Sequence, residues 1–341
     1  MSARVLSIDP ISPQAETLRD AAAVLRAGDL VAFPTETVYG LGGLALSPRS
    51  LEAIFRAKGR PPSHPLIAHV LDEAAARALA SSWPEQASLL AERFWPGPLT
   101  LVVGRGPSVP LALSGGKNTV AIRVPAHPVS RGLLAELGEP IAAPSANAYQ
   151  TLSPTRAEHV ARSLGERVSL ILDGGPSPLG LESTVIDLTR SQPRVLRPGA
   201  LPISELRAVL PDLVVDAGTP ALESERLSPG QDAVHYAPRA VLVVLPRSEA
   251  ILRSRAEGDR AGLVLRGPGR SSAQQRVLPE TPEGFGRELF AALHDLDAAG
   301  VSLIIVEAPP TDEAWLAVRD RLGRASRPGE AAPTTSLLEP E

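Results

Sequence analysis

The sequence predicts an α/β protein with a mixed, twisted sheet in a first domain and a smaller, Rossmann-like parallel sheet in a second. Its 341 residues are more than one average domain needs. Apolar runs of strand and helix length alternate irregularly over residues 10–205 and regularly over residues 239–327. Residues 206–238 between them lose this periodicity and collect Pro, Gly, Ser and acidic residues, which is typical of a linker or lid. Residues 328–341 are expected to form a disordered tail.

The first domain begins with a helix that we expect to start at Ser12 and Pro13. A second helix with the same Ser-Pro start is predicted over residues 47–59, so Lys58 and Arg60 lie where it gives way to a loop. Short apolar runs predict strands at residues 30–33, 66–70, 99–103, 119–124, 141–143, 169–172, 184–188 and 194–196. Two Ala/Leu-rich helices after residue 70 and helices at 129–137 and 155–164 complete the domain. Several strands follow one another too closely for helical crossovers, which predicts a mixed sheet.

The second domain alternates strands and helices more regularly. Strands are predicted at residues 240–245, 261–265 and 302–306, with helices ending near 256 and spanning 284–299 and 312–324. Each strand is followed by a helix long enough for a crossover, which favours parallel pairing.

Composition excludes several classes of protein. Lys and Arg number 34 and Asp and Glu 38, so the net charge of −4 provides no overall basic field for a nucleic acid. The chain has no cysteine, which excludes disulfides, thiolate nucleophiles and cysteine-bound zinc. The N-terminus has no signal-peptide pattern, and no run of about 18 apolar residues occurs. We therefore expect a soluble, cytoplasmic protein without a membrane partner or a protein-bound metal site.

The candidate chemistry is a set of polar side chains at strand and helix ends. The glycines at 40–43 and 267–269 fit neither G-x-G-x-x-G nor the Walker pattern, and Ser145 lacks a G-x-S-x-G context. In an open α/β sheet, groups at the carboxyl ends of strands often face one crevice. Such groups are Thr35, Glu36, Thr37, Lys58, Arg60, Arg123, Ser145, Asn147, Ser183, Thr184 and Arg197. Four of these groups, Lys58, Arg60, Arg123 and Arg197, are cations. Bringing them together is costly unless an anion offsets their repulsion, which predicts a polyanionic ligand, such as a nucleoside triphosphate, an amino-acid carboxylate, or both. The alternative is that these cations are solvated surface groups.

Longer strings of the first domain resemble the threonylcarbamoyl-AMP synthase family, whose catalytic domain has a YrdC-like fold. They are FPTETVYGLG (33–42), KGRP (58–61), HPLIAHV (64–70), FWPGPLTLV (94–102), TVAIRVPAHP (119–128), PIAAPSAN (140–147), SPT (153–155), ILDGG (171–175), ESTVIDL (182–188) and VLRPG (195–199). SPG (228–230), HYAP (235–238) and RDRLGRAS (319–326) resemble the long, two-domain branch of that family.

The resemblance implies an enzyme, a nucleotidyltransferase that makes L-threonylcarbamoyladenylate from L-threonine, bicarbonate or CO2, and ATP, with Mg2+ and release of pyrophosphate. A downstream tRNA threonylcarbamoyltransferase is the implied partner, because the product modifies the tRNA adenosine next to the anticodon. Catalysis by positioning and by cations needs no protein nucleophile.

The resemblance also assigns residues. It implies a catalytic and nucleotide-binding group of Lys58, Arg60, Ser145 and Asn147. Further nucleotide contacts are implied for Thr119, Ser153, Arg197 and Tyr236, and threonine contacts for Thr35, His69, Arg123, Ala143 and Ser183. Arg123 is expected to pair bidentately with the threonine carboxylate. Residues 231–234 lack the basic residue usual in the family, which puts the closure of the linker over the site in question.

Several of these residues have structural alternatives. Lys58 and Arg60 at a helix end complement the helix dipole, and Ser145 and Asn147 are common turn residues. His69 on an apolar strand also fits a core histidine with its hydrogen bonds satisfied, and Tyr236 fits a lid without direct contact. A further alternative for the whole domain is an RNA-binding module that uses the same basic crevice, with weak, salt-dependent binding.

Overall fold

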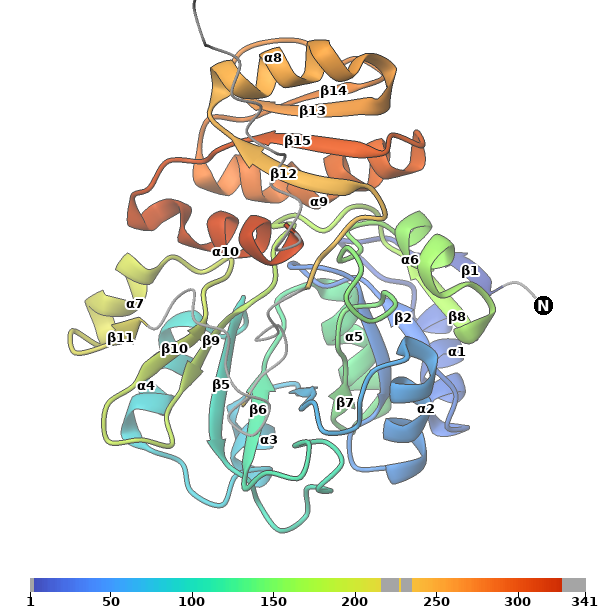
Figure 1. The fold of residues 1–341 in the computed structure, drawn as a ribbon. Coiled ribbons are helices and arrows are strands. Elements are labelled where there is room, and N and C mark those ends of the chain that lie inside the picture. Colours follow the sequence, from blue (N-terminus) through green and yellow to red (C-terminus); the bar gives the residue numbers. More distant parts are fainter. Residues whose placement is uncertain (1–2, 216–226, 228–234, 327–341) are drawn as a thin grey trace, which may run out of the picture.

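The computed structural model describes residues 3–215, 227 and 235–326. The expected tail at 328–341 and the substituted linker residues 231–234 lie outside the described residues. The described chain forms two sheets, one above the other in Figure 1.

The larger sheet has eleven strands in the order β1-β8-β2-β3-β7-β4-β6-β5-β9-β10-β11 (Figure 1). Neighbours such as β4 and β6 run parallel, whereas β5 and β6 run antiparallel, so the expectation of a mixed sheet is confirmed. The strands are β1 (Arg4–Ser7), β2 (Val31–Phe33), β3 (Gly40–Leu44), β4 (Ile67–His69), β5 (Leu99–Gly104), β6 (Thr119–Arg123), β7 (Ile141–Ala142), β8 (Leu170–Asp173), β9 (Thr184–Asp187), β10 (Arg194–Arg197) and β11 (Val214–Val215). This sheet extends beyond residues 10–205 at both ends.

Helices cover both faces of this sheet, because alternate strand residues point to opposite faces. Val31 and Phe33 of β2 pack with apolar residues of α1 and α5, whereas Ala32 belongs to the core that includes α2, α4 and α6. The helices are α1 (Ala15–Arg26), α2 (Pro48–Lys58), α3 (Glu73–Ala78), α4 (Glu85–Phe94), α5 (Pro128–Leu137), α6 (Ala157–Leu164) and α7 (Ile203–Val209), with a 3-10 turn at Gly165–Arg167.

The smaller sheet consists of four parallel strands in the order β12-β15-β13-β14. Its strands are β12 (Val241–Leu245), β13 (Ala261–Arg266), β14 (Gln275–Leu278) and β15 (Leu303–Glu307). Helix α8 (Arg247–Glu257) covers one face, and α9 (Pro282–Ala298) covers the other. Helix α10 (Leu316–Ala325) lies between the two sheets in Figure 1, and short 3-10 turns occupy Gly258–Arg260 and Glu313–Trp315. The predicted parallel layer sandwich is confirmed.

Sequence patterns did not predict β1, β3, β11, β14 or α7. Strand β3 has the sequence GLGGL, which has low strand propensity, but a Cβ on Gly42 would lie 2.7 Å from the Phe33 ring. Close packing of the antiparallel strand β2 therefore requires a glycine at this position. The expected helix start at Ser12 is wrong: α1 begins at Ala15 with Gln14 as N-cap, and the Ser12 amide instead donates to the Asp9 carboxylate.

Candidate active site

One pocket of the larger domain collects most of the predicted site residues. It encloses about 520 Å³ of empty space, including its open mouth. Its walls come from the loop between β2 and β3, residue 60 after α2, strand β4, the end of β6, the loop after β7, residues 182 and 183 before β9, the end of β10, and residues 235 and 236. The predicted residues that line it are Thr35, Thr37, Arg60, His69, Arg123, Ala143, Ser145, Ser183, Arg197 and Tyr236. Strand ends far apart in the sequence thus meet at one hollow, as the sheet topology requires.

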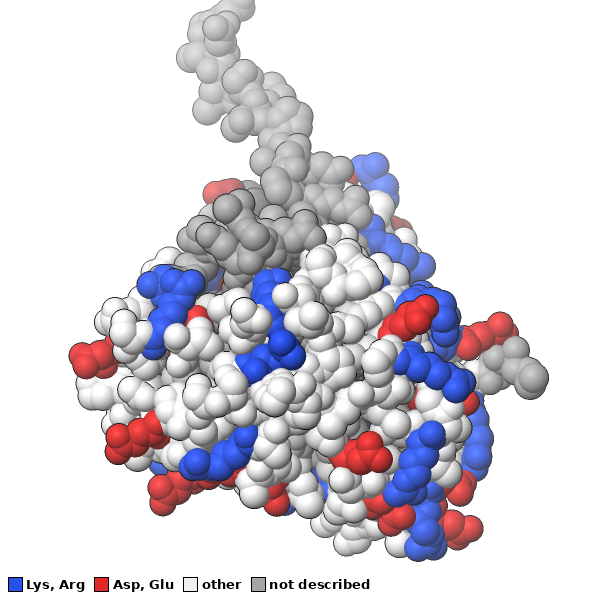
Figure 2. All heavy atoms as spheres, turned by 90° about the horizontal axis from the view of Figure 1, so that it is seen from below, with Lys and Arg blue, Asp and Glu red and all other residues white. Residues whose placement is uncertain are grey.

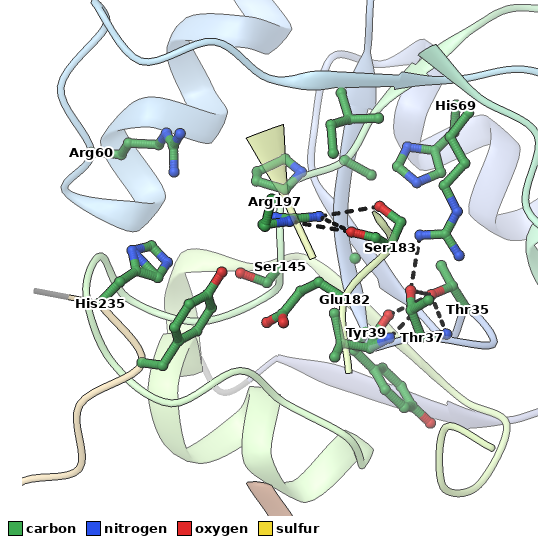
Figure 3. A pocket seen from close by; sticks show the side chains of 17 residues that line it. Thr35, Thr37, Tyr39, Arg60, His69, Ser145, Glu182, Ser183, Arg197 and His235 are labelled. Atoms are coloured by element: carbon green, nitrogen blue, oxygen red, sulfur yellow. Dashed lines mark hydrogen bonds between the residues drawn. The ribbon is translucent and has the colours of Figure 1, made fainter. Parts of the chain in front are cut away.

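The pocket has two distinct ends. In Figure 3, Arg60 and His235 lie at one side, while His69, Thr35 and Thr37 lie at the other. Ser145, Glu182, Ser183 and Arg197 lie between them. We call the side with Arg60 and His235 the basic end and the side with His69, Thr35 and Thr37 the hydroxyl-rich end. The two ends face different parts of any molecule that fills the pocket.

Lys58 lies directly behind this wall, at the last residue of α2. Its Nζ donates to the carbonyl oxygens of Ser145 at 2.6 Å and of Asn147 at 2.5 Å. Burial, reinforced by the nearby charges of Arg60 and Arg167, holds the pKa of Lys58 well below that of a free lysine. The Asn147 side-chain amide donates to the carbonyls of Ala148 and Thr151. Lys58 and Asn147 therefore stabilise the loop that presents Ser145, and neither lines the pocket directly.

Arg60 is buried, and a neighbouring loop holds its guanidinium in place. Its Nη2 donates to the carbonyl oxygen of Pro65 at 3.1 Å. The segment of Pro65 packs against the turn at 111–116, where the amide of Leu66 donates to the carbonyl of Leu113. A Cβ on Gly115 would lie 2.3 Å from the carbonyl oxygen of Ser63, so the two loops are in close contact. The direction of Arg60 thus depends on a turn about fifty residues further along the chain.

Arg123 belongs to a buried cluster at the hydroxyl-rich end. Its Nη2 donates to Glu36 Oε1 at 2.5 Å, its Nη1 to Thr37 Oγ1 at 2.9 Å and its Nε to the carbonyl of Gly97 at 3.2 Å. Thr35 Oγ1 lies 2.8 Å from Thr37 Oγ1 and donates to the carbonyl of Val38. Arg123 is therefore already paired with the carboxylate of Glu36. A substrate carboxylate that pairs bidentately with Arg123 would have to displace Glu36 or share the guanidinium with it.

His69 faces the same end of the pocket and is held neutral. Burial, with the charge of Arg123 acting in the same direction, lowers the pKa of His69 to about 3. Its Nδ1 is buried and has no hydrogen-bond partner. Hydrogen bonds with the backbone at Ile67 and Ile141 act on this pKa in the opposite direction, so the threonine contact and the core histidine both stay predictions for His69.

Ser183 and Arg197 form the middle of the pocket. Arg197 donates from Nε and Nη2 to the carbonyl of Ser183 and from Nη2 to its hydroxyl at 3.1 Å. Ser183 Oγ also lies 2.7 Å from Thr100 Oγ1 on β5. Burial lowers the pKa of Arg197, although the neighbouring Tyr236 and Glu182 act against it. This network fixes a cation and a hydroxyl group side by side.

Glu182 is a pocket residue that the sequence analysis did not select. One of its oxygens accepts a hydrogen bond from Ser153 Oγ, and the other accepts one from Arg321 Nε at 2.6 Å. Burial raises the pKa of Glu182, but Arg321, Arg197 and Ser153 outweigh it and lower the pKa below its ordinary value. Arg321 comes from α10 and pairs also with Asp320. Glu182 stands in the string ESTVIDL and Arg321 in RDRLGRAS, but neither string indicates that the two side chains meet across 139 residues.

Residues that follow the linker complete the wall. Tyr236 is buried, with its ring 5.7 Å from that of Phe290 on α9, and its hydroxyl has no hydrogen-bond partner. The amide of His235 donates to the carbonyl of Arg324 on α10. Like Lys58 and Asn147, the predicted residues Thr119 and Ser153 do not line the pocket: Thr119 starts β6 opposite Gly104, and the Ser153 hydroxyl donates to Glu182, which does line it.

The surface offers no uniform basic face in the view of Figure 2, where basic and acidic side chains are interspersed. Within the described ranges, no group of three or more His, Asp or Glu residues could hold a metal ion. The described helices include none that is long and apolar enough to cross a membrane.

Comparison with known proteins shows what this chain is related to. A family model described as telomere recombination matches residues 23–199, and one described as threonylcarbamoyl-AMP synthase, C-terminal domain, matches residues 201–327. The threonylcarbamoyl-AMP synthase of Pyrococcus abyssi is 42% identical over 91% of this chain and 94% of its own length. This chain belongs to the threonylcarbamoyl-AMP synthase family.

Other members of the threonylcarbamoyl-AMP synthase family agree with this membership. The enzyme of Bacillus subtilis is 39% identical over 93% of this chain and 95% of its own length. The crystal structure of P. abyssi Sua5 complexed with L-threonine matches with a TM-score of 0.87 at 39% identity, covering 94% of this chain and 97% of that one. The fold with two domains, of which the first carries the pocket, is thus the fold of this synthase family.

Proposed function

We propose that this pocket synthesises L-threonylcarbamoyladenylate from L-threonine, bicarbonate or CO2, and ATP, and releases pyrophosphate. The observation that carries the proposal is the convergence of Arg60, Arg123 and Arg197 on one buried hollow, with Lys58 behind its wall. Buried cations are costly unless an anion offsets their charge. Glu36 offsets part of this charge through Arg123, and a triphosphate beside an amino-acid carboxylate would offset the rest. Membership of the synthase family and the threonine complex of P. abyssi Sua5 support the same assignment.

The hydroxyl-rich end is the proposed threonine subsite. Thr35, His69 and Arg123 line this end, Ala143 and Ser183 belong to the same pocket wall, and the neutral imidazole of His69 offers its buried Nδ1. Arg123 uses one N–H each for Gly97, Thr37 and Glu36, so two N–H groups of its guanidinium remain for a carboxylate. Glu36 then shares Arg123 with the substrate and keeps the guanidinium in place.

The basic end is the proposed triphosphate subsite. Arg60 and Tyr236 line it, Arg197 and Ser145 separate it from the threonine, and Lys58 and Asn147 support Ser145 from behind. The unpartnered hydroxyl of Tyr236 is available to a phosphate or ribose oxygen. The nucleotide roles implied for Thr119 and Ser153 stay proposals: Thr119 lies outside the pocket lining, and Ser153 would act through Glu182.

The chemistry then follows from positioning. The threonine amine attacks CO2 and loses a proton, which gives an N-carboxylate. One oxygen of this N-carboxylate attacks the α-phosphorus, and the bond from that phosphorus to the bridging oxygen breaks as pyrophosphate leaves. Negative charge builds up on the departing pyrophosphate, where Arg60 of the pocket wall is placed to stabilise it, while Lys58 holds the loop of Ser145 from behind. Removing one such donor typically lowers the rate by a factor on the order of a hundred.

Magnesium fits this site as a companion of the nucleotide. Among the described residues that line the pocket, Glu182 is the only carboxylate, and Mg2+ typically binds through one or two carboxylates together with substrate phosphates. Both oxygens of Glu182 already accept hydrogen bonds, from Ser153 and Arg321, so this carboxylate does not fit as a free ligand, and the ion would have to enter with the phosphates of ATP, whose charge it would neutralise. The product is proposed to pass to a tRNA threonylcarbamoyltransferase in the cytoplasm.

The test is pyrophosphate release by the purified full chain. Release should require ATP, L-threonine, bicarbonate and Mg2+ together, and release without threonine would refute the assignment. Arg123→Ala should raise the KM for threonine at least tenfold with a smaller effect on the KM for ATP, whereas Arg60→Ala should reduce turnover and weaken ATP binding with little effect on the KM for threonine. Equal effects of both variants on both substrates would contradict the two subsites. Salt-sensitive RNA binding without any pyrophosphate release would favour the RNA-binding alternative instead.

A further inference from the structure

Tyr149 lies outside the pocket but contacts residues on both sides of its basic end. Its ring centroid is 5.5 Å from that of His64, with the planes at 70°, and 6.2 Å from that of His235, with the planes at 77°. The guanidinium carbon of Arg60 lies 6.0 Å from the same centroid. The ring therefore packs edge to face against two imidazoles, and the guanidinium of Arg60 lies near the largest distance at which a cation–aromatic attraction is expected.

The backbone around Tyr149 joins two segments that are distant in the sequence. The amide of Tyr149 donates to the carbonyl of Lys58, the last residue of α2, at 2.8 Å. The next residue, Gln150, accepts a hydrogen bond from the amide of Ala237 at 2.9 Å, and Thr151 forms a parallel bridge with Ala237. Residues 149–151 thus hold the end of α2 on one side and the segment after the linker on the other.

The rings continue this connection toward the second domain. His235 lies 4.2 Å from Tyr236 between ring centroids, and Tyr236 lies 5.7 Å from Phe290 on α9. Tyr149 is the member of this row that also contacts Arg60. Its side chain lines a separate cavity next to the pocket, so it does not itself face the proposed ligand.

We propose that Tyr149 is a positioning residue that holds the guanidinium of Arg60 and the imidazole of His235 in one cluster. The segment after the linker and the cation of the first domain then act together on the same bound anion. This inference rests on the proposed function, because the anion in question is the triphosphate of ATP. Tyr149 acts through Arg60 and His235. Its hydroxyl lies 3.4 Å from His64 Nδ1, but the contacts with Arg60 and His235 are made by the ring, to which we assign the effect.

The experiment compares Tyr149→Phe with Tyr149→Leu in the full chain. ATP affinity is measured by calorimetry without threonine, and the KM values for ATP and threonine are measured by pyrophosphate release. Tyr149→Leu should weaken ATP binding about tenfold, because it removes a cation–aromatic contact and two ring contacts, and should leave the KM for threonine within about twofold. Tyr149→Phe keeps the ring and should remain within about twofold of the parent protein. In an Arg60→Ala background, Tyr149→Leu should add little further loss.

Trp83→Leu is the matched control. Trp83 also lies under an arginine, with the guanidinium carbon of Arg77 5.4 Å from its ring, but it lies outside the pocket lining. This variant should lower the melting temperature without changing ATP affinity. If Tyr149→Leu does not fold, Tyr149→Met keeps most of the volume without the ring and is expected to show the same loss.

Several results would overturn the inference. They are an unchanged ATP affinity in Tyr149→Leu, a parallel rise in both KM values, a loss in Tyr149→Phe equal to that in Tyr149→Leu, or a failure of both ring-free variants to fold. Measurements on the unsubstituted protein distinguish a failure of this inference from a failure of the proposed function. If the parent binds ATP and releases pyrophosphate only with threonine while Tyr149→Leu behaves identically, only the role of Tyr149 is wrong.

Discussion

Two adjacent glycines allow the loop that holds Arg60 to be tested. Gly115 and Gly116 both have positive φ, at 60° and 82°. A Cβ on Gly115 would lie 2.3 Å from the carbonyl oxygen of Ser63 and 3.0 Å from the nitrogen of Pro65, whereas a Cβ on Gly116 has nothing within 4 Å. Gly116→Ala therefore carries the backbone penalty alone, and Gly115→Ala adds a steric clash.

The two contributions differ in size. An alanine in the left-handed region costs about 1 kcal/mol, which is the loss of stability expected for Gly116→Ala. Gly115→Ala must in addition move the Ser63 segment by about 1 Å to reach ordinary contact distance, for a further cost of ~1–3 kcal/mol. That segment carries the Pro65 carbonyl that accepts the hydrogen bond from Arg60 Nη2. A displacement of about 1 Å in a positioned group can lower the rate about a hundredfold.

The assay combines urea unfolding with pyrophosphate release. Gly115→Ala should lower kcat/KM for ATP between tenfold and a hundredfold, while Gly116→Ala stays within about twofold of the parent. Both proteins must be folded at the assay temperature, which the unfolding curves establish. Equal activity of the two variants would refute the reasoning, because it would mean that the Ser63 loop can shift to relieve the clash without displacing Arg60.

Two further predictions concern protonation and backbone strain. Burial lowers the pKa of Lys58 in the free protein, and a bound triphosphate should raise it, so ATP binding should be accompanied by net proton uptake at some pH below the usual pKa of lysine. Calorimetry of ATP binding in buffers of different ionisation enthalpy, repeated over a range of pH, measures this uptake, and equal binding heats in all buffers at every pH would contradict it. The same shift should make the free protein more stable as pH rises toward the unfolded pKa of lysine, because the unfolded chain binds the extra proton. Gln150 has a φ of 66°, so Gln150→Gly should increase the free energy of unfolding by about 1 kcal/mol, and a decrease would show that its side chain compensates for the strain.

The local patterns of the sequence were sufficient for most helices and strands. The alternation of apolar residues in the second domain predicted its parallel sheet, and short apolar runs predicted β2, β4, β5 and β6 within a residue or two. Strands β3 and β14 were missed because neither has a strong apolar run: β3 is held by close packing against Phe33, and β14 by pairing with β13. Their conformations depend on neighbours that a local pattern does not contain.

The candidate site was likewise predicted only in part from the sequence. Polar groups at strand ends indicated a common crevice, and motif resemblance added Tyr236, which the pocket indeed includes. The pairing of Arg123 with Glu36 and of Glu182 with Arg321 was not predicted. Each charged residue has many possible partners in the sequence, and only the folded chain brings one of them within hydrogen-bond distance.

The sequence by itself determined the residue types of the pocket and the elements that carry them, because side-chain chemistry and periodicity are local properties. Tertiary structure decided which charges are compensated. It buried Lys58 against two carbonyl groups, left a nitrogen of His69 without a partner, and connected Tyr149 to both Arg60 and His235. Burial and pairing set the free energy of each charge, and both depend on which distant segments the fold brings into contact.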